Sequence, residues 1–265
     1  AGEAAPAGQE EKPKEPERPK EAEADAPPDS RPKVKAGSVA VNMADTTLNV
    51  MPTAGGKLLM TLTEGGLQYL LAGARANVGV KSGRYMFEVK IVENLNTSDP
   101  SGVSKNAPQP KNLVKVGFSL ACSSLIADGQ DSVSFDSEGR FISGRMKKKA
   151  SVKFVRGQTV GVLLNLDAAS PNKNTISLFR NGLRVAEPQP LPESLCGKAL
   201  YPTVTYRNVS VQLNLGPTAV CPLPFQCRML GDAAAADVEV AKLAEPTGSC
   251  EVLVPVGLPE AGFFD

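Results

Sequence analysis

The sequence predicts an all-β protein: a two-sheet antiparallel β-sandwich with a disordered N-terminal segment and an irregular C-terminal tail. Three observations support this class. Several short segments alternate apolar and polar residues with a period of two, which is typical of half-buried strands. The dipeptide Asn181-Gly182 joins two such segments and is the strongest short signal for a hairpin. No helical period of comparable length lies between the segments, so two packed antiparallel sheets are expected.

Residues 1–37 are expected to be disordered. The first 35 residues are rich in Ala, Pro, Glu and Lys, and Val34 is the only large apolar residue among them. Such a segment buries too little apolar surface to offset the entropy lost on ordering. Its mixed charges suit a solvated linker, and the alternative is an interaction tail. The chain opens at Ala1 without an initiator methionine or an apolar signal-peptide core, as expected of a processed chain or a fragment.

Residues 38–220 are expected to contain the strands of the sandwich. In the first clear strand, Tyr85, Phe87 and Val89 share one face, whereas Glu88 lies on the other. In the second, alternation places Lys115 and Ser119 on the outward face. The main expected strands are 84–92, 113–120, 159–166, 175–180, 183–187 and 209–215. One of them, 159–166, is apolar on both faces, which is typical of a central strand.

Composition excludes several classes of function. The formal net charge is +1, so any affinity for nucleic acid must come from a local patch. No apolar run approaches the ~20 residues that span a bilayer, and no contact with a membrane is expected. The chain has no His, the commonest general base and zinc ligand.

The cysteines indicate a reducing compartment, either the nucleus or the cytoplasm. There are 5 of them, an odd number, and none forms a C-x-x-C pair. Neither a zinc site nor a disulfide framework is therefore expected. Cys122 follows a strand-like run and is expected to be a buried thiol in the core.

Five ordered stretches between residues 72 and 216 resemble the SPRY (B30.2-like) domain family. They read AGARANVGVKSGRYMFEVKI at 72–91, VKVGFSL at 114–120, FVRGQTVGVLLNLD at 154–167, ISLFRNG at 176–182 and ALYPTVTYRNVSVQLNLG at 199–216. The resemblance implies a concanavalin-like sandwich, in agreement with the strand pattern. It also implies a non-catalytic module that binds a short segment of a partner protein with the loops at one end.

The tail, residues 221–265, indicates which group of SPRY proteins the sequence resembles most. Its end reads CEVLVPVGLPEAGFFD, in which Gly257 and Gly262 have the five-residue offset of the phosphate loop G-x-x-x-x-G-K-[ST]. In proteins similar to heterogeneous nuclear ribonucleoprotein U, a SPRY domain is followed at this distance by a P-loop kinase-like domain that opens with G-L-P-x-x-G-K-T. This resemblance implies a scaffold in nuclear RNA processing that binds a partner peptide within a ribonucleoprotein assembly.

The tail lacks the groups that a phosphate loop needs. Phe263 and Phe264 stand where the motif has Lys and Ser or Thr, and a phenyl ring offers neither a positive charge nor a ligand for Mg²⁺. We interpret the tail as a broken or truncated kinase-domain entrance, with coincidence as the alternative. No cofactor, small-molecule substrate or catalytic residue is therefore expected, and a nucleotide-dependent enzyme is the least favoured function.

The first candidate binding loop is the segment 93–112, which is long, polar and rich in Pro, Ser and Asn. A structureless connection of this length is usually functional or disordered. Partner contacts are expected from Asn96, Ser98, Asp99, Lys105 and Asn106. The alternative is a mobile insertion.

The second candidate is the loop 144–156, which reads GRMKKKASVKFVR and contains no acidic residue. Its cations are Arg145, Lys147, Lys148, Lys149, Lys153 and Arg156. Such a cluster could hold an RNA backbone with salt-dependent, sequence-independent affinity. Only Phe154 could stack on a base, and the family pattern places this ring in the core. The alternatives are a solvated turn and part of a nuclear-import signal at 147–149.

A third stretch, 128–139, suggests a calcium site because it carries four carboxylates. The spacing does not fit D-x-[DN]-x-[DN]-G, and no bidentate Glu follows at the required place. We therefore expect no metal site and interpret the four acids as turn residues: Asp128, Asp131, Asp136 and Glu138. The part at 136–139 matches a glycine-bearing hairpin of the SPRY pattern.

Overall fold

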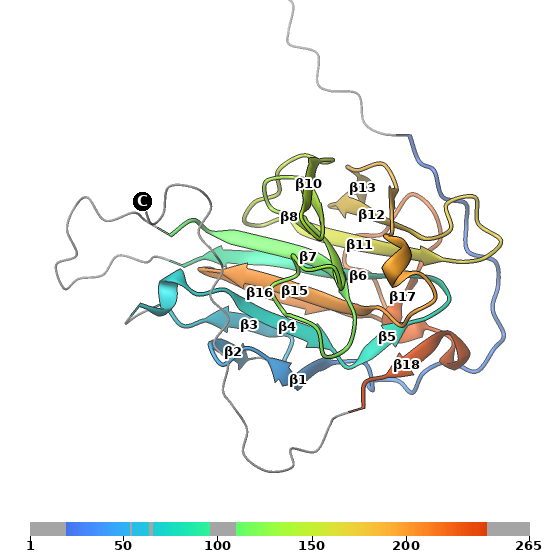
Figure 1. The fold of residues 1–265 in the computed structure, drawn as a ribbon. Helices are drawn as coiled ribbons and strands as arrows, with labels where there is room; N and C mark the ends of the chain where they lie inside the picture. The colour runs from blue at the N-terminus through green and yellow to red at the C-terminus, as the bar shows by residue number, and fades with distance from the viewer. Residues whose placement is uncertain (1–19, 54, 64–65, 96–109, 243–265) are drawn as a thin grey trace, which may run out of the picture.

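The protein is described here by a computed structural model, which covers residues 20–53, 55–63, 66–95 and 110–242. These residues form two large antiparallel sheets that pack face to face (Figure 1). The prediction of an all-β sandwich is therefore confirmed. The helical turns in the described part are short 3₁₀ segments: η1 (Leu67–Tyr69), η2 (Glu193–Leu195), η3 (Leu230–Asp232) and η4 (Ala235–Asp237).

The first sheet has seven strands. Their spatial order is β1 (Val41–Thr46), β4 (Ala72–Ala76), β15 (Tyr201–Arg207), β7 (Leu113–Ser119), β8 (Ser132–Asp136), β9 (Arg140–Ser143) and β10 (Met146–Lys149). The strands β8, β9 and β10 follow one another in sequence and in space, so this edge of the sheet is a simple meander. The strand β7 precedes β8 in the chain and pairs with it, whereas β1, β4 and β15 reach the sheet from other parts of the chain.

The second sheet has nine strands. Seven lie in the order β13 (Leu183–Arg184), β12 (Thr175–Arg180), β11 (Thr159–Leu166), β6 (Gly83–Asn94), β16 (Val209–Asn214), β3 (Leu58–Thr61) and β2 (Val50–Thr53). Two short strands lie off this path: β14 (Gln189–Pro190) pairs with β12, and β17 (Arg228–Met229) runs parallel to β6. A separate pair is formed by β5 (Val78–Val80) and β18 (Val238–Val240).

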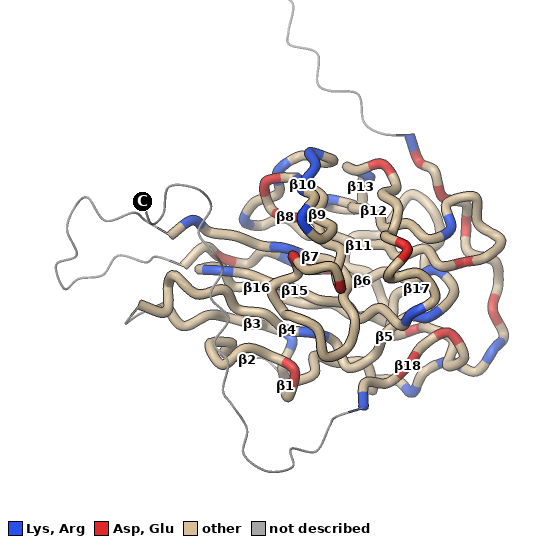
Figure 2. The backbone as a smooth tube through the Cα atoms, in the orientation of Figure 1, with Lys and Arg blue, Asp and Glu red and all other residues tan. Residues whose placement is uncertain are grey.

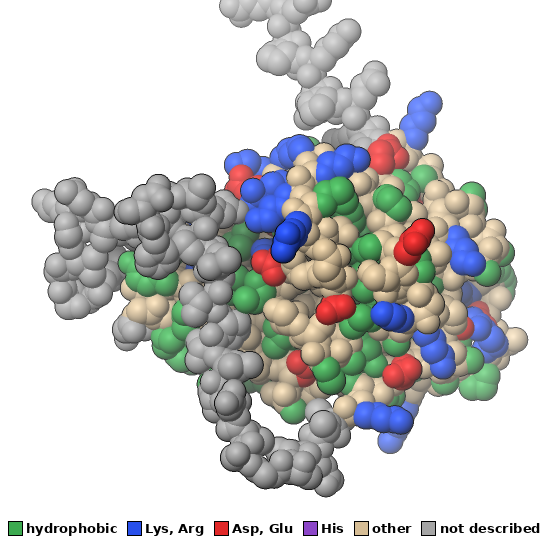
Figure 3. Space-filling model, viewed as in Figure 1, with side chains coloured by type: hydrophobic (Ala, Val, Ile, Leu, Met, Phe, Trp, Pro, Cys, Tyr) green, Lys and Arg blue, Asp and Glu red, His purple; other side chains and the backbone are tan. Residues whose placement is uncertain are grey.

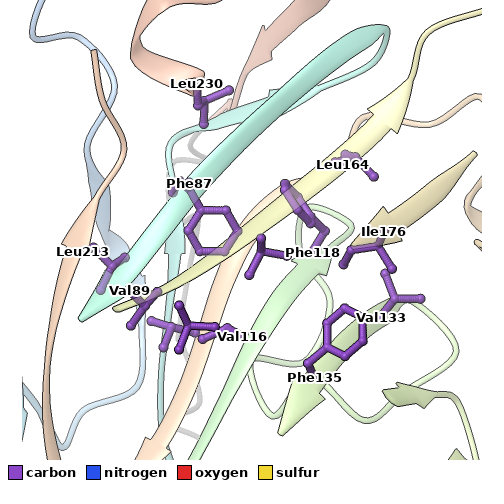
Figure 4. Close-up of a cluster of buried hydrophobic side chains, with 14 of the residues drawn as sticks. Phe87, Val89, Val116, Phe118, Val133, Phe135, Leu164, Ile176, Leu213 and Leu230 are labelled. Atoms are coloured by element: carbon purple, nitrogen blue, oxygen red, sulfur yellow. The ribbon is translucent and has the colours of Figure 1, made fainter. Parts of the chain in front are cut away.

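The core lies between the two sheets, and the period-two pattern correctly predicts its contents. Phe87 of β6 meets Phe118 of β7 edge to face, with 5.2 Å between ring centroids. Figure 4 shows both rings among aliphatic side chains from the two sheets. The strand β11 is buried along its whole length, as predicted for a central strand. The predicted hairpin is also present, since Asn181 and Gly182 connect β12 to β13 with positive φ angles.

The outer face of the first sheet differs from the prediction. Alternation places Lys115 and Ser119 of β7 in solvent, but both are buried because the segment 120–131 folds over the strand. Lys115 Nζ donates to the carbonyl of Ile126 at 3.1 Å. Ser119 Oγ accepts from Nε of the buried Arg75 at 2.9 Å. Cys122, predicted to be a core thiol, is exposed in this covering segment.

The outer face of the second sheet is covered as well. Glu88, expected in solvent, is buried, and its carboxylate accepts the backbone N–H groups of Val220 at 2.6 Å and Cys221 at 2.9 Å. A second apolar cluster lies on the same face and contains Met86, Leu163, Phe179, Phe225 and Met229. Residues 217–229 therefore act as an outer layer. The expected boundary at residue 220 is too early, since β17 and β18 pair with strands of the fold.

The N-terminal segment also corrects the prediction. Residues 20–37, which we call the N-terminal strap, follow a defined path along the domain (blue in Figure 1). Glu21 pairs with Arg184, and Glu23 pairs with Arg84, each at 2.7 Å. Disorder was predicted because the strap has few apolar residues, but ion pairs and backbone hydrogen bonds hold it instead. Residues 1–19 lie outside the described part.

Candidate functional site

One end of the sandwich, called here the open end, brings together the ends of strands from both sheets. In the second sheet β6 ends at Asn94 and β16 begins at Val209, while in the first sheet β7 begins at Leu113. The segment 150–158 crosses from one sheet to the other at this place. Its backbone is fixed on both sides, because Phe154 N donates to the carbonyl of Ser137 at 3.1 Å and Gly157 N to that of Ile91 at 2.7 Å.

A cavity of about 130 Å³ lies at the open end, between the two sheets. Its lining comes from separate segments of the chain, and the apolar part consists of Ile91, Leu113, Val114, Phe154, Val155 and Val209. Polar groups line the rest, among them Asn94, Asn112, Lys153 and Arg156. Phe154 is 2% exposed and forms part of the core, as the family pattern predicts, whereas the neighbouring Val155 is 56% exposed. The cavity thus combines an apolar wall with polar residues and with charged residues of both signs, since Glu138 also lines it.

The basic segment 144–156 is not simply a loop. Residues Met146–Lys149 form β10, which pairs with β9 and is the edge strand of the first sheet. Lys147 and Lys149 point to one face and Lys148 to the other, because side chains alternate along a strand. All four residues of β10 are exposed. Lysines on an edge strand also hinder pairing with a second sheet, which is a structural reason for their presence.

Some cations of the basic segment have partners and others do not. Lys149 Nζ donates to the carbonyl of Glu138 at 2.6 Å, and Lys153 Nζ pairs with the Glu138 carboxylate at 2.5 Å. Within the part of the chain that the structure describes, the remaining cations make no ion pair or side-chain hydrogen bond: Arg145, Lys147, Lys148 and Arg156. Figure 2 places this positive charge along β10, and Figure 3 shows basic side chains gathered there on the surface.

The charge of β10 also reaches into the sheet. Burial lowers the pKa of Lys115 on β7 of the same sheet. The negative charge of Asp128 opposes this lowering, whereas the positive charge of Lys147 adds to it. The distance between Lys115 Nζ and an Asp128 carboxylate oxygen is 3.5 Å. Lys147 therefore adds to the positive potential on the outer face of the sheet, rather than acting as an isolated surface charge.

In the acidic stretch 128–139, the Asp136 carboxylate stabilises a turn. Asp136 Oδ1 accepts the backbone N–H groups of Glu138 and Arg140, at 3.1 and 2.9 Å, and Gly139 turns the chain with φ of 80°. The predicted glycine-bearing hairpin between β8 and β9 is thus confirmed. Among the residues described, no group of three or more His, Cys, Asp or Glu side chains could hold a metal ion.

Other predicted site residues lie outside the described residues. They are Asn96, Ser98, Asp99, Lys105 and Asn106 of the partner loop and Gly257 and Gly262 of the phosphate-loop-like tail. The structure does describe the two stems of the partner loop, and both Asn94 and Asn112 line the cavity. No helix in the described ranges has the length and apolar character needed to cross a membrane.

Sequence reasoning missed the cavity. Its walls come from residues as far apart as Ile91 and Val209. No local sequence pattern links these segments, so the sequence contains no direct signal for the cavity.

The solved structures that match this chain include SPRY domains. The SPRY domain of human HERC1 matches with a TM-score of 0.46 and 17% identity, over 66% of this chain and 97% of that one. Another human SPRY domain matches with a TM-score of 0.45 and 18% identity, over 64% and 98% of the two chains. No protein-family model matches the sequence.

The chain is also similar in sequence to two curated proteins. The chain is 28% identical over 207 residues to heterogeneous nuclear ribonucleoprotein U-like protein 2 of Mus musculus, and 26% identical over 198 residues to the Homo sapiens protein. Each match covers 73% of this chain but only 25% of the relative. The predicted resemblance to heterogeneous nuclear ribonucleoprotein U-like proteins is confirmed, and the chain spans about a quarter of the length of these relatives.

Proposed function

We propose that this chain is a non-catalytic interaction module that binds a short segment of a partner protein at the open end. The observation that carries the proposal is the cavity of about 130 Å³ with its apolar wall and polar surroundings. One apolar side chain of a peptide would enter it, while Asn94 and Asn112 would bond the peptide backbone. Binding sites usually combine an apolar pocket with a few placed polar groups, as this one does.

The proposed setting is a ribonucleoprotein assembly in the nucleus, with the cytoplasm as the alternative. The names of the curated relatives, which identify them as heterogeneous nuclear ribonucleoprotein U-like proteins, support this setting and a scaffold role in RNA processing. The chain has no His, the commonest general base, and we propose neither a catalytic activity nor a cofactor for it.

The test of peptide binding uses the exposed Val155. Peptides selected from a random library on the full chain should bind Val155→Asp about tenfold more weakly, because a carboxylate would replace the apolar contact. The matched control is Val240→Asp, since Val240 is 62% exposed but lies on β18, away from the open end. Affinities would be measured by fluorescence anisotropy. Equal loss in both variants, or no loss in Val155→Asp, would count against the cavity.

Direct RNA binding through the basic segment is the second candidate. The observation in its favour is the edge strand β10, with all four of its residues exposed and three of them Lys. A labelled single-stranded RNA would be titrated at two salt concentrations with the wild type and with Lys147→Glu, Lys148→Glu, Lys149→Glu. We expect the variant to bind about tenfold more weakly and with a shallower salt dependence. Each phosphate contact that is lost lowers the number of counterions released when the RNA binds.

The control for that experiment carries the same charge change at scattered sites. Lys57→Glu, Lys173→Glu, Lys198→Glu alters three exposed lysines away from β10. If this control loses as much affinity as the β10 variant, binding depends on net charge alone and the basic segment is not the site. If the wild type does not bind even at low salt, direct RNA binding is excluded.

A further inference from the structure

The outer face of the second sheet carries a different surface, the one under the N-terminal strap. Three carboxylates of the strap, spaced two residues apart, all contact the domain. Glu21 accepts from Arg184 Nη2 at 2.7 Å, Glu23 accepts from Arg84 Nη1 at 2.7 Å, and Asp25 accepts the backbone N–H of Gln226 at 2.7 Å. A spacing of two is what an extended segment needs to present every second side chain to the same surface.

The groups that receive these carboxylates are held by the domain itself. The guanidinium of Arg184 stacks on Phe179 with 4.6 Å to the ring centroid, and the side chain is 2% exposed. The guanidinium of Arg84 lies over Phe225 at 5.4 Å. Both rings belong to the second apolar cluster, which contains no strap residue. Both arginines therefore have contacts within the domain that do not involve the strap.

Two amides complete the receiving site for Glu23. Asn165 Nδ2 donates to its carboxylate at 3.0 Å, and Asn172 Nδ2 donates to it at 3.3 Å. Asn172 Nδ2 also donates to the backbone carbonyl of Ala22 at 2.7 Å, so it recognises the main chain as well as the carboxylate. Asn165 is the register partner of Arg84 across β11 and β6, which fixes the amide and the guanidinium side by side.

The strap satisfies the charges but leaves apolar space unfilled. The three residues directly after Asp25 are small, and these residues, Ala26, Pro27 and Pro28, line two cavities of about 430 and 820 Å³. The larger cavity is walled mainly by apolar side chains: Met86, Ala219, Pro222, Leu223 and Phe225. None of these three strap residues has a side chain large enough to fill the space beside this wall.

We infer that this surface, which we call the strap groove, is a binding site for an acidic segment of another protein. The segment would carry carboxylates at every second position, followed directly by a large apolar side chain that enters the cavity beside Ala26. In the free protein the strap occupies this groove. Its intrinsic affinity is low, but it belongs to the same chain and is therefore present at high effective concentration. The inference rests on charge complementarity and unfilled volume, and it does not depend on the open end.

The experiment uses labelled peptides and the full chain. The first peptide is KEAEADAPP, the sequence of residues 20–28, and the second is KEAEADLPP, with leucine at the position of Ala26. A third peptide, KEEDAAAPP, has the composition of the first but clusters its acids. Each is titrated by fluorescence anisotropy into the wild type and into the Glu21→Gln, Glu23→Gln variant, whose strap is weakened.

The expected result has three parts. The weakened-strap variant should bind KEAEADAPP about tenfold more tightly than the wild type, because less of its groove is occupied in cis. KEAEADLPP should bind about tenfold more tightly than KEAEADAPP, since a buried leucine adds apolar contact. KEEDAAAPP should bind more weakly than either, because its acids cannot all face the groove.

Asn172→Asp, added to the weakened-strap variant, tests whether the peptide binds in the strap groove. It places a like charge beside the carboxylate at the Glu23 position and should weaken peptide binding about tenfold. Asn172 lies in a loop, so unfolding is not expected, and thermal melting monitored by circular dichroism checks this. The inference is overturned if the weakened-strap variant shows no saturable binding. It is also overturned if wild type and variant bind KEAEADAPP equally, or if Asn172→Asp has no effect.

Discussion

The two ends of the sandwich differ in whether their charged side chains are buried and paired or exposed to solvent. At the end opposite the cavity, which we call the closed end, Asp237 has a side chain that is 7% exposed. Its carboxylate accepts from Tyr85 Oη at 2.6 Å, from Ser82 Oγ at 2.8 Å and from both terminal nitrogens of Arg31. Beside the open end, by contrast, the lysines of the edge strand β10 are exposed.

The pKa shifts show the same contrast. Burial acts to raise the pKa of Asp237, but the hydrogen bonds from Arg31, Tyr85 and Ser82 outweigh it, and the pKa lies below its usual range. Burial and the hydrogen bond to Asp237 raise the pKa of Tyr85 to about 12. The closed end therefore uses its charge for stability. Exposed charge at the open end contributes little to stability and is available for binding.

The largest effect is expected for Asp237→Ala. The substitution leaves Tyr85, Ser82 and Arg31 without their shared acceptor and disconnects the strap from the segment that precedes β18. Removing one partner of a buried polar cluster should lower the free energy of unfolding by about 3 kcal/mol. Urea denaturation measures it. A loss below about 1 kcal/mol would show that the closed end does not depend on this carboxylate.

The second prediction concerns pH. Because the folded-state pKa of Asp237 is depressed, its stabilisation is fully present above the unfolded value, about 4, and is lost as pH falls through the folded value. Asp29 shifts in the same direction through its hydrogen bonds with Arg31. The difference in unfolding free energy between the wild type and Asp237→Asn should therefore shrink between about pH 5 and about pH 2. A difference that stays constant with pH would contradict this assignment.

A smaller effect is expected for Arg31→Gln. The Arg31 side chain is 49% exposed, so water can replace much of what the substitution removes, and Asp237 retains Tyr85 and Ser82 as donors. We expect a loss of about 1 kcal/mol in urea denaturation. If Arg31→Gln costs as much as Asp237→Ala, the stabilisation of the closed end comes mainly from this one ion pair.

The sequence predicts the inner layers of the fold well because their signal is local. A period of two over 84–92 places Tyr85, Phe87 and Val89 in the core, where they lie. Continuous apolar character correctly marks β11 as a central strand. The dipeptide Asn181-Gly182 fixes a hairpin without knowledge of any other segment.

The outer layers were not predictable because their partners are distant in sequence. Glu21 and Arg184 are separated by 163 positions, and nothing in the composition of the strap indicates that pairing. Lys115 was expected in solvent because alternation says nothing about a later segment folding over the strand. At the candidate site, the sequence identified the cations of β10. It did not identify the edge strand, which has no alternating apolar residues, or the cavity beside it.

The smallest effect is expected at the open end, for Lys148→Glu. Lys148 is exposed on β10, and no ion pair or side-chain hydrogen bond involves it in the described part of the chain. Its replacement should change the unfolding free energy by less than about 0.5 kcal/mol. A loss above about 1 kcal/mol in urea denaturation would mean that β10 contributes to the stability of the sheet. The lysines would then be explained by protection of the sheet edge, and both the contrast between the two ends and the case for an RNA contact at β10 would weaken.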